Sequence, residues 1–500
     1  MSTERRPDIV YIMSDQHARK VAGCYGDTVV ATPHLDALAR QGVVFDNGYC
    51  PSPICVPSRM SAFTGQWPFE QQCWTLQDHL GTDRPTWMHA LGAADYRPTL
   101  VGRMHAVGPD QHHGFAERIG AEPGPHWPGV PRQDLGVLAG AQGPARVSVE
   151  RSGRGQSAYQ LADEEVARDA AQWLDGVGRR RRAGDAEPFC LMVGFTLPHC
   201  PFVARGEDFD AYDGRVGPPE HPPPDPSREH PWLAKWRAAC GIATLEPADV
   251  LRARTAYYGL VARTDALVGQ VLAALDRNGL RQNTLIVYTS DHGEQIGERG
   301  LWWKNTFYEE SAGVPLIVSW PGHLPHNERR GHVVNLIDIG ATLIDAAGAP
   351  GLPASHGRSL LGIARDPAAP WENVTFSEYV TDTAAAWTGP EATRQRMIRS
   401  DRYKLVVIDG YPSMLFDLED DPAERRDLAG DPAHAGIRED LEARVFANWD
   451  PRAIEAIVAR RQQEKTILHR WAARTRPPLH FVRPLDPAES WLDDRPRANA

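Results

Sequence analysis

The stretch "DIVYIMSDQ", which runs from Asp8 to Gln16, combines a short apolar run with a carboxylate at its end. The run "DIVYIM" is rich in β-branched residues, which is typical of a buried strand. Asp15 follows it, and two further strand-like segments have the same design, because His199 follows "FCLMVGFTLP" and Asp291 follows "TLIVYTS". A structural core does not require polar groups at three strand ends, so these three residues are candidates for a functional site.

The pattern around these strands predicts an α/β fold. Helix-like segments alternate with strand-like segments over about the first 350 residues, and such alternation is typical of a mostly parallel central sheet flanked by helices. In such sheets, ligand groups gather at the carboxyl ends of the strands. One expected helix occupies residues 31–42, with Thr32 as its N-cap and Pro33 as its first residue.

The character of the sequence changes near residue 370. Short strand-like segments of the antiparallel type follow, and then an arginine-rich helical tail that ends in a loop-like segment. We therefore expect a large α/β domain over residues 1–370. A smaller C-terminal α+β subdomain, with a small antiparallel sheet, a helix and an extended tail, is expected over residues 371–500.

Charge and cysteine content exclude several classes of protein. A net charge of −11 argues against general nucleic-acid binding, and the basic run at 179–182 is interpreted as a solvated surface loop because Gly178 and Gly184 flank it. The seven cysteines match no zinc or redox spacing, which favours a reducing compartment. No apolar stretch is long enough to span a membrane and no signal-peptide pattern precedes the first strand, so we expect a cytoplasmic protein.

Cys55 stands in an unusual context. It lies in "SPICVPSRMSAFTGQWP", just before Pro57, Ser58 and Arg59. A lone cysteine is most often a small buried hydrophobe. The residues that follow it here favour a chemical role instead, because they fit a known signature.

Several motifs together resemble the sulfatase family of the alkaline phosphatase superfamily. "CVPSR" (55–59) fits the Cys-x-Pro-x-Arg signature of that family, and the other motifs keep the family's order along nearly the whole chain. They are "SDQ" (14–16), "GRMH" (102–105), "PHCPF" (198–202), "SDHGEQIGERGLWWKNTFYEES" (290–311) and "LFDLEDDPAERRDLA" (415–429). Within the family, "GRMHAVGPDQHHGFAER" (102–118) and the tail "ANWDPRAIEAIVARRQQEK" (447–465) are similar to choline sulfatases. The resemblance makes residues 1–370 the expected sulfatase catalytic domain.

The resemblance implies that Cys55 is oxidised to formylglycine by a separate formylglycine-generating enzyme. The hydrated aldehyde is a geminal diol, in which one hydroxyl attacks sulfur and the other then expels sulfate. Pro57 and the residues after it suit a helix start, where backbone N–H groups favour an anion. Arg59 is expected to hold the diol and the carboxylates of a metal site.

That metal site is expected to comprise Asp15, the modified Cys55, Asp291 and His292. A hard divalent cation prefers oxygen ligands and neutralises charge in the transition state. Many sulfatases have two aspartates after the first strand, whereas this chain has Asp15 followed by Gln16. Gln16 is therefore a candidate contact for the metal or the substrate. Calcium is the first choice of metal, with manganese and magnesium left open.

The resemblance assigns roles to four more residues. His105 is expected to contact the diol and assist proton removal, while His199 and Lys304 are expected to bind the sulfate and assist the leaving oxygen. Arg103 occupies a position where the family commonly has lysine. The positive charge is kept, but a guanidinium differs from an ammonium in reach and in hydrogen-bond geometry. It is expected to orient the diol or the sulfate.

We therefore expect a hydrolase that releases inorganic sulfate from a small sulfate monoester, either choline sulfate-like or an aryl sulfate. Several of the 15 tryptophans lie near the motifs, and aromatic faces can hold a quaternary ammonium, although core packing is their more common use. One alternative is a phosphonate monoester or phosphodiester hydrolase of the same superfamily. Another is a non-catalytic binding protein in which Cys55 stays a thiol. The tail resembles one that makes subunit contacts in choline sulfatases, so a homo-oligomer is also expected.

Overall fold

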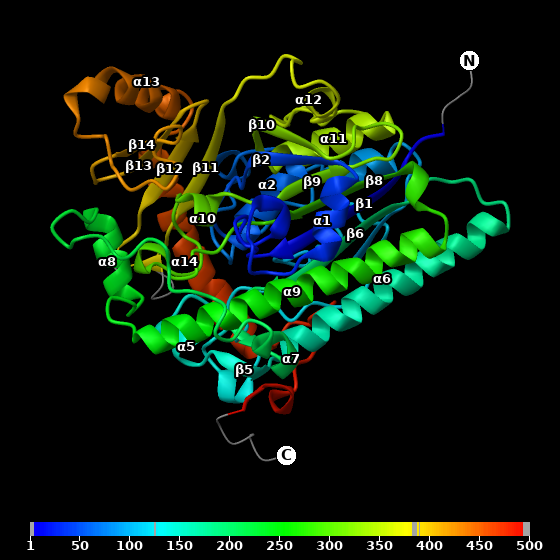
Figure 1. Ribbon diagram of the computed structural model, residues 1–500, viewed down its shortest axis with the longest axis horizontal. Coiled ribbons are helices and arrows are strands. Elements are labelled where there is room, and N and C mark those ends of the chain that lie inside the picture. The colour runs from blue at the N-terminus through cyan, green and yellow to red at the C-terminus, as the bar shows by residue number, and fades with distance from the viewer. Residues whose placement is uncertain (1–4, 125–126, 383–387, 390, 494–500) are drawn as a thin grey trace.

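A large central sheet organises the protein (Figure 1). The computed structural model describes residues 5–124, 127–382, 388–389 and 391–493. Only β9 runs antiparallel to its neighbours, so the predicted mostly parallel sheet is confirmed. The strands are, in spatial order, β10 (Glu328–Asn335), β2 (Val43–Tyr49), β9 (Leu316–Ser319), β8 (Thr284–Ser290), β1 (Asp8–Asp15), β6 (Cys190–Pro198), β3 (Pro98–Gly102) and β4 (Glu117–Ile119).

Helices cover both faces of this sheet, and for that reason every residue of the central strands β1, β6 and β8 is buried. Two long helices, α6 (Ala158–Arg182) and α9 (Pro247–Arg277), lie side by side across one face together with α1 (Pro33–Arg40). The opposite face carries α2 (Cys55–Thr64), α4 (Trp87–Gly92) and α11 (Ile337–Ala347). The remaining short helices are α3 (Pro68–Gln71), α5 (Arg146–Glu150), α7 (Gly206–Asp210), α8 (Pro231–Ala239), α10 (Glu309–Ala312) and α12 (Leu361–Arg365). None of the described helices has both the length and the apolar character needed to cross a membrane.

One local expectation was wrong. The arginine run at 179–182 is the last turn of α6 and not a loop, because cations at a helix C-terminus complement the helix dipole. Arg181 there pairs with Asp8 at 2.6 Å. In α1, Thr32 is the N-cap residue and Pro33 is the first residue, as expected; the Thr32 hydroxyl donates to the Asp36 carboxylate at 3.1 Å and makes no hydrogen bond to the backbone of the first turn.

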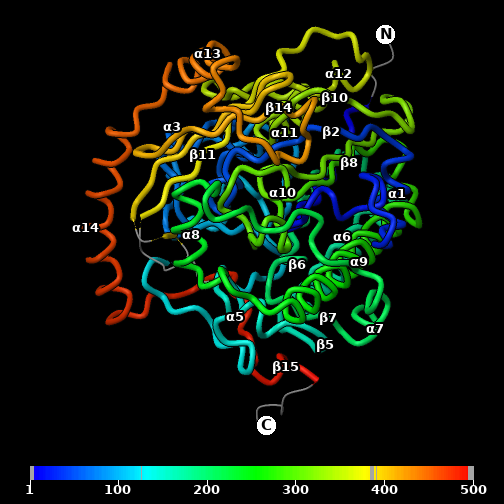
Figure 2. The backbone as a smooth tube through the Cα atoms, turned by 60° about the vertical axis from the view of Figure 1, so that its left-hand side comes forward, coloured from blue at the N-terminus to red at the C-terminus, as the bar shows by residue number. Residues whose placement is uncertain are grey.

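The C-terminal part builds a second, antiparallel sheet. Its side chains alternate with the period of a strand: in β13, Val406 and Ile408 join the main core, while Leu405 and Val407 pack in a separate apolar cluster with α13 and α14. The long helix α14 stands at the outer edge of the molecule (Figure 2). The division of the chain into two parts near residue 370 stays a prediction. The last residues of the predicted C-terminal subdomain, 494–500, lie outside the described part of the chain. The elements are β11 (Thr375–Val380), β12 (Arg394–Arg399), β13 (Tyr403–Ile408), β14 (Met414–Asp417), α13 (Ala435–Phe446) and α14 (Pro451–Thr475).

The tail after α14 returns to the large sheet's side of the molecule (Figure 2). There, β15 (Trp491–Leu492) pairs with β5 (Gly153–Gln156), which also pairs with β7 (Val203–Ala204). Between α14 and β15, the carbonyl of Phe481 accepts a hydrogen bond from the backbone N–H of Glu122 at 3.0 Å. The tail therefore supports the loop segment around residue 122, which forms part of the candidate site described next.

Candidate active site

The carboxyl ends of three adjacent strands meet at one edge of the sheet. Asp15 ends β1, Asp291 follows β8, and His199 follows β6, and all three are buried. Because β1 lies between β6 and β8 in the sheet, the three side chains converge. The grouping expected from the strand ends is therefore present.

Cys55 is the first residue of α2, which points its N-terminus into this group of residues. The helix starts two residues before Pro57, which sits in the first turn, where a missing N–H costs nothing. Burial raises the pKa of the Cys55 thiol to about 12, and the charge of Asp15 adds to the effect. The thiol is therefore neutral at physiological pH and a poor nucleophile.

Cys55 belongs to a buried four-residue cluster with Asp15, Asp291 and His292, whose donor atoms all lie within 4.8 Å of one another. Sγ of Cys55 lies 3.1 Å from Nε2 of His292, and its thiol donates to Oδ1 of Asp15 at 3.6 Å. These are the four residues that the sequence predicted as metal ligands.

The protonation of His292 tests whether this cluster fits a cation. Nδ1 of His292 lies 3.0 Å from the carbonyl oxygen of Gly293, which can only accept, so Nδ1 carries the proton. Burial lowers the pKa of His292, which keeps the ring neutral. Its Nε2 lone pair then faces Oδ1 of Asp291 at 3.5 Å and Oδ1 of Asp15 at 3.7 Å. Three acceptors facing one another repel unless a cation lies among them, so the donor set fits a divalent metal.

Two arginines orient the carboxylates of this cluster. Arg59 is fully buried and donates through Nε to Oδ2 of Asp291 at 2.8 Å and through Nη2 to Oδ2 of Asp15 at 3.2 Å. Arg103 donates through Nε to the same Oδ2 of Asp15 at 2.9 Å. Burial alone would raise the pKa of Asp15, but these cations and others nearby hold it well below its usual range. Each aspartate thus keeps Oδ1 turned toward the cluster.

Arg103 also orders His105. Nη2 of Arg103 donates to Nδ1 of His105 at 2.8 Å, which leaves the proton of a neutral imidazole on Nε2. The sequence did not identify Glu122, whose buried carboxylate accepts from the backbone N–H of His105 at 3.0 Å and lies 3.7 Å from Nη1 of Arg103. No sequence motif marks Glu122. Its backbone is positioned by a hydrogen bond to the carbonyl of Phe481, a tail residue that is distant in the sequence.

A second hydrogen-bonded chain links the sulfate-binding candidates. Lys304 donates to Oε1 of Gln16 and, at 3.0 Å, to Nε2 of His199. Nδ1 of His199 lies 2.6 Å from the carbonyl oxygen of Cys200, so Nε2 carries the accepting lone pair. Nε2 of Gln16 donates to Oε2 of Glu294 at 2.5 Å. The Gln16 side chain is thus engaged by Lys304 and by Glu294, a residue that the sequence did not identify.

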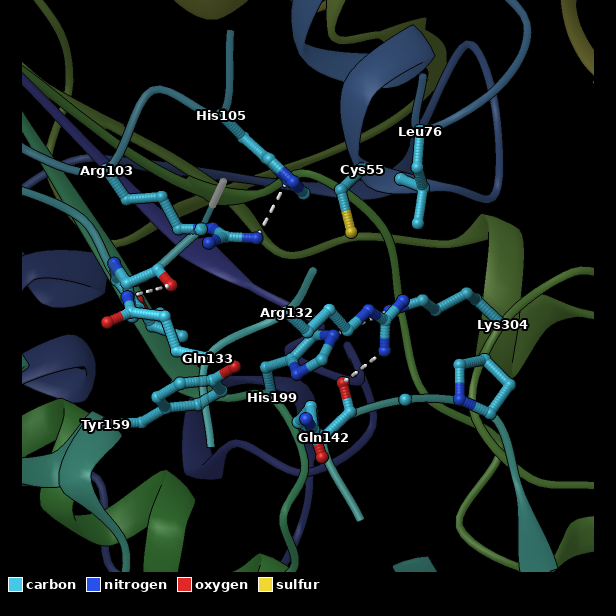
Figure 3. A pocket seen from close by; sticks show the side chains of 15 residues that line it. Cys55, Leu76, Arg103, His105, Arg132, Gln133, Gln142, Tyr159, His199 and Lys304 are labelled. Carbon is cyan, nitrogen blue, oxygen red and sulfur yellow. Dashed lines mark hydrogen bonds between the residues drawn. The ribbon is translucent and has the colours of Figure 1, made fainter. Parts of the chain in front are cut away.

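The predicted residues border a cavity of about 80 Å³. Cys55, Arg103, His105, His199 and Lys304 line it, and Figure 3 shows Cys55 and His105 on one side with Tyr159 and Gln142 on the other. The remaining predicted residues, Arg59, Asp15, Gln16, Asp291 and His292, lie behind this lining in the buried clusters described above.

The sequence missed the outer wall of the cavity, which includes Arg132, Gln133, Gln142 and Tyr159. These residues come from loops and from a helix start, where no motif singles them out. No tryptophan is among the described residues that line the cavity. Trp302 and Trp303, which lie within the motif at 290–311, are fully buried in the core.

Comparison with known proteins gives consistent matches. Residues 7–349 match the family described as Sulfatase, and residues 297–449 match the C-terminal family of N-sulphoglucosamine sulphohydrolase. The choline-sulfatase of Rhizobium meliloti (strain 1021) is 32% identical over 498 residues, which cover 93% of this chain and 91% of the relative. The arylsulfatase K of Homo sapiens is 28% identical over 454 residues, which cover 85% of this chain and 79% of the relative. The structure of the phosphonate monoester hydrolase SpPMH from Silicibacter pomeroyi superposes with a TM-score of 0.70 at 27% identity, covering 88% of this chain and 95% of that one.

Proposed function

The chain belongs to the sulfatase family, whose members are sulfuric ester hydrolases, and from this premise we propose that the Cys55 cavity hydrolyses a small sulfate monoester and releases inorganic sulfate. One observation carries the proposal: Cys55 starts a helix at the cavity and lies 3.1 Å from His292 within a buried cluster that also contains two aspartates. Choline sulfate and an aryl sulfate are the substrates to test first, because the relatives named above are a choline-sulfatase and an arylsulfatase.

We propose that Cys55 is used as formylglycine and that Asp15, Asp291, His292 and the modified Cys55 hold one divalent ion, with calcium as the first choice. Once formed and hydrated, the formylglycine would supply a geminal diol as nucleophile. The ion, when bound, would supply positive charge for the developing oxyanion. The neutral thiol of Cys55 supports this proposal, since burial raises its pKa to about 12. Arg59 keeps both carboxylates turned toward the ion through its hydrogen bonds to Asp15 and Asp291.

The remaining residues bind and move protons. Burial would lower the pKa of Lys304, but the pKa is raised by neighbouring acidic groups, of which the carboxylates of Asp15 and Asp291 remain when Cys55 is converted, so its ammonium stays charged as a donor to a sulfate oxygen. Nε2 of His199 accepts from Lys304 and can relay a proton toward the leaving oxygen. His105, held by Arg103, directs Nε2–H toward the diol or the sulfate. A base role for its Nδ1 would require Arg103 to release that atom.

The test combines maturation with turnover. The full chain is produced with and without a formylglycine-generating enzyme, and peptide mass spectrometry measures conversion of Cys55. Released sulfate is then measured on choline sulfate and on an aryl sulfate. We expect hydrolysis only from the converted protein, and none from a Cys55→Ala variant. Equal hydrolysis by converted and unconverted protein would disprove the proposed nucleophile.

A phosphonate monoester or phosphodiester hydrolase is the second candidate function. Its support is the likeness to the phosphonate monoester hydrolase structure at 27% identity. Parallel kinetics on an aryl sulfate and on an aryl phosphonate monoester separate the two. We expect the larger kcat/KM for the sulfate, and a much larger value for the phosphonate would favour the second function.

We further propose a cytoplasmic homo-oligomer that depends on the converting enzyme for maturation. All seven cysteines are free, which supports a reducing compartment. Large apolar side chains are exposed on α14, including Ile467, Leu468 and Trp471, which supports a contact between copies of the chain.

A further inference from the structure

We infer that the alcohol part of the substrate carries a second anionic group, a carboxylate or a second sulfate, which is held by Arg132 in the wall of the Cys55 cavity. This inference rests on the proposed function, and it names the class of ester that the site takes: of the two esters to be tested first, it favours an aryl sulfate with an anionic substituent over choline sulfate. The argument depends on the charge and hydrogen bonding of the outer wall.

Arg132 lines the cavity, and no carboxylate in the described part of the chain pairs with it. Among the described residues, no acidic side chain lies within ion-pair distance of it, and its hydrogen bond is a long one of 3.4 Å from Nη1 to the backbone carbonyl of Gln142. Its guanidinium rests on Gly143, because a Cβ on that glycine would fall 2.6 Å from Nη1. The charge is felt inside the cavity, where Arg132 opposes the rise that burial causes in the pKa of Tyr159. Arg132 is thus a solvent-exposed cation at the edge of the cavity, and no described carboxylate compensates its charge (Figure 3).

The charges of the other cations at the cavity, Arg103 and Lys304, are already balanced or needed for the sulfate. Arg103 is compensated by Asp15 at 2.9 Å and by Glu122 at 3.7 Å. Lys304, together with the proposed metal, is sufficient for the single charge of a sulfate monoester. Within the described part of the chain, no aspartate or glutamate lines the cavity. One positive charge, that of Arg132, therefore remains for the rest of the substrate, and its planar fork matches a carboxylate or sulfate.

The same wall does not suit a quaternary ammonium. Such a group needs aromatic faces or acidic side chains, whereas Tyr159 is the one Tyr, Phe or Trp side chain among the described lining residues. Arg132 would repel it. In addition, the Oε1 atom of Gln142 is buried and has no hydrogen-bond partner. An orphaned acceptor in a cavity wall needs a donor, and a hydroxyl beside the substrate's anionic group would supply one.

Kinetics on matched aryl sulfates test the inference with the converted full chain. The three esters are para-sulfooxybenzoate, its carboxamide, and the para-trimethylammonium phenyl sulfate. We expect wild type to favour the carboxylate over the carboxamide about tenfold in kcat/KM, equivalent to about 1.4 kcal/mol. Arg132→Gln should abolish this preference, and Arg132→Lys should retain part of it.

Two further variants exclude a merely structural effect. Arg132→Glu should reverse the order and favour the trimethylammonium ester, which misfolding would not do. Gly143→Ala leaves Arg132 in the chain but displaces its guanidinium, so the preference should fall to an intermediate value. The matched control is Arg168→Gln, since Arg168 is 67% exposed on α6 and does not line the cavity. Its selectivity should equal that of wild type.

Binding separates this inference from the proposed function. Calorimetry with Cys55→Ala protein measures affinity for the carboxylate and the carboxamide without turnover. A carboxylate preference that Arg132→Gln removes supports the inference even if no ester is hydrolysed, in which case only the proposed function fails. Absence of a preference in wild type, or its persistence in Arg132→Gln, overturns the inference.

Discussion

Nε2 of His292 lies 3.1 Å from Sγ of Cys55, and its lone pair is directed there because Nδ1 is hydrogen-bonded to the carbonyl of Gly293. This contact connects the proposed modification site, Cys55, to the candidate metal ligands. It also means that the N-terminus of α2 and the loop after β8 must be positioned together, which the hydroxyl of Ser58 achieves by donating to the carbonyl of Asp291 at 2.5 Å.

Removing the divalent ion should lower the melting temperature and abolish activity. Bound metal stabilises the folded state by mass action, and the buried carboxylates of Asp15 and Asp291 face each other without it. Scanning calorimetry before and after chelation, followed by equal additions of calcium, manganese or magnesium, measures this effect. Asp291→Asn should lose the response, and a change at the partly exposed Asp175, Asp175→Asn, should keep it. An unchanged melting temperature after chelation would contradict the metal site.

Arg59→Met should destabilise the fold by about 3–5 kcal/mol, because it leaves two buried carboxylates partly uncompensated. Arg59 is fully buried and pairs with Asp15 and Asp291. Urea unfolding provides the measurement. As a control, Arg277→Met breaks an exposed pair with Asp175 and should cost no more than about 1 kcal/mol. Similar losses in the two variants would show that Arg59 carries no special charge compensation.

Lys304→Met should reduce kcat by about 10²- to 10³-fold, the usual effect of losing one transition-state donor. Gln16→Met should act through Lys304, since Gln16 is its hydrogen-bond acceptor, and should lower kcat more than it changes KM. Lys235, which is 51% exposed on α8, supplies the control variant Lys235→Met with unchanged kinetics. A Gln16→Met enzyme with normal kcat would rule out this positioning role.

Asp163 should make stability fall as pH rises. Burial raises its pKa to about 7 in the folded protein, although it accepts the backbone N–H groups of Thr196 and Leu197 at 2.9 and 2.6 Å. Because the folded pKa exceeds the unfolded value of 3.8, the contribution is fully present below that value and is lost as pH rises toward 7. The slope is at most about 1.4 kcal/mol per pH unit. Urea unfolding across this range should show a flatter profile for Asp163→Asn, and an identical slope would contradict the shift.

Ile467→Glu should dissociate the proposed oligomer. Ile467 is 70% exposed on α14, beside the exposed Trp471, and a carboxylate in an apolar interface is costly. Sedimentation velocity at matched concentrations measures the change in mass. Arg460→Ala on the same helix is the control and should leave the mass unchanged. Wild-type protein that sediments as a monomer would show that this face does not join copies of the chain.

The sequence predicted much of the site because local patterns mark it. Apolar β-branched runs identified β1, β6 and β8, and the rule that ligands gather at strand ends brought Asp15, Asp291 and His199 together. Cys55 was identified by the residues that follow it. The role of Gln16 was left open between metal and substrate, and its hydrogen bonds to Lys304 and Glu294 were not foreseeable, because they join residues almost 300 positions apart.

By itself, the sequence determined the α/β fold, the family and the residues at the strand ends, since hydrophobic periodicity and short motifs are local properties of the chain. Only the tertiary structure decided which groups surround them. Glu122 contacts His105 where the C-terminal tail pairs with its loop, and Arg132 faces the cavity with no acidic partner among the described residues. Such contacts depend on how distant segments pack, so charge balance in the wall, and with it the class of substrate, emerges only in the folded protein.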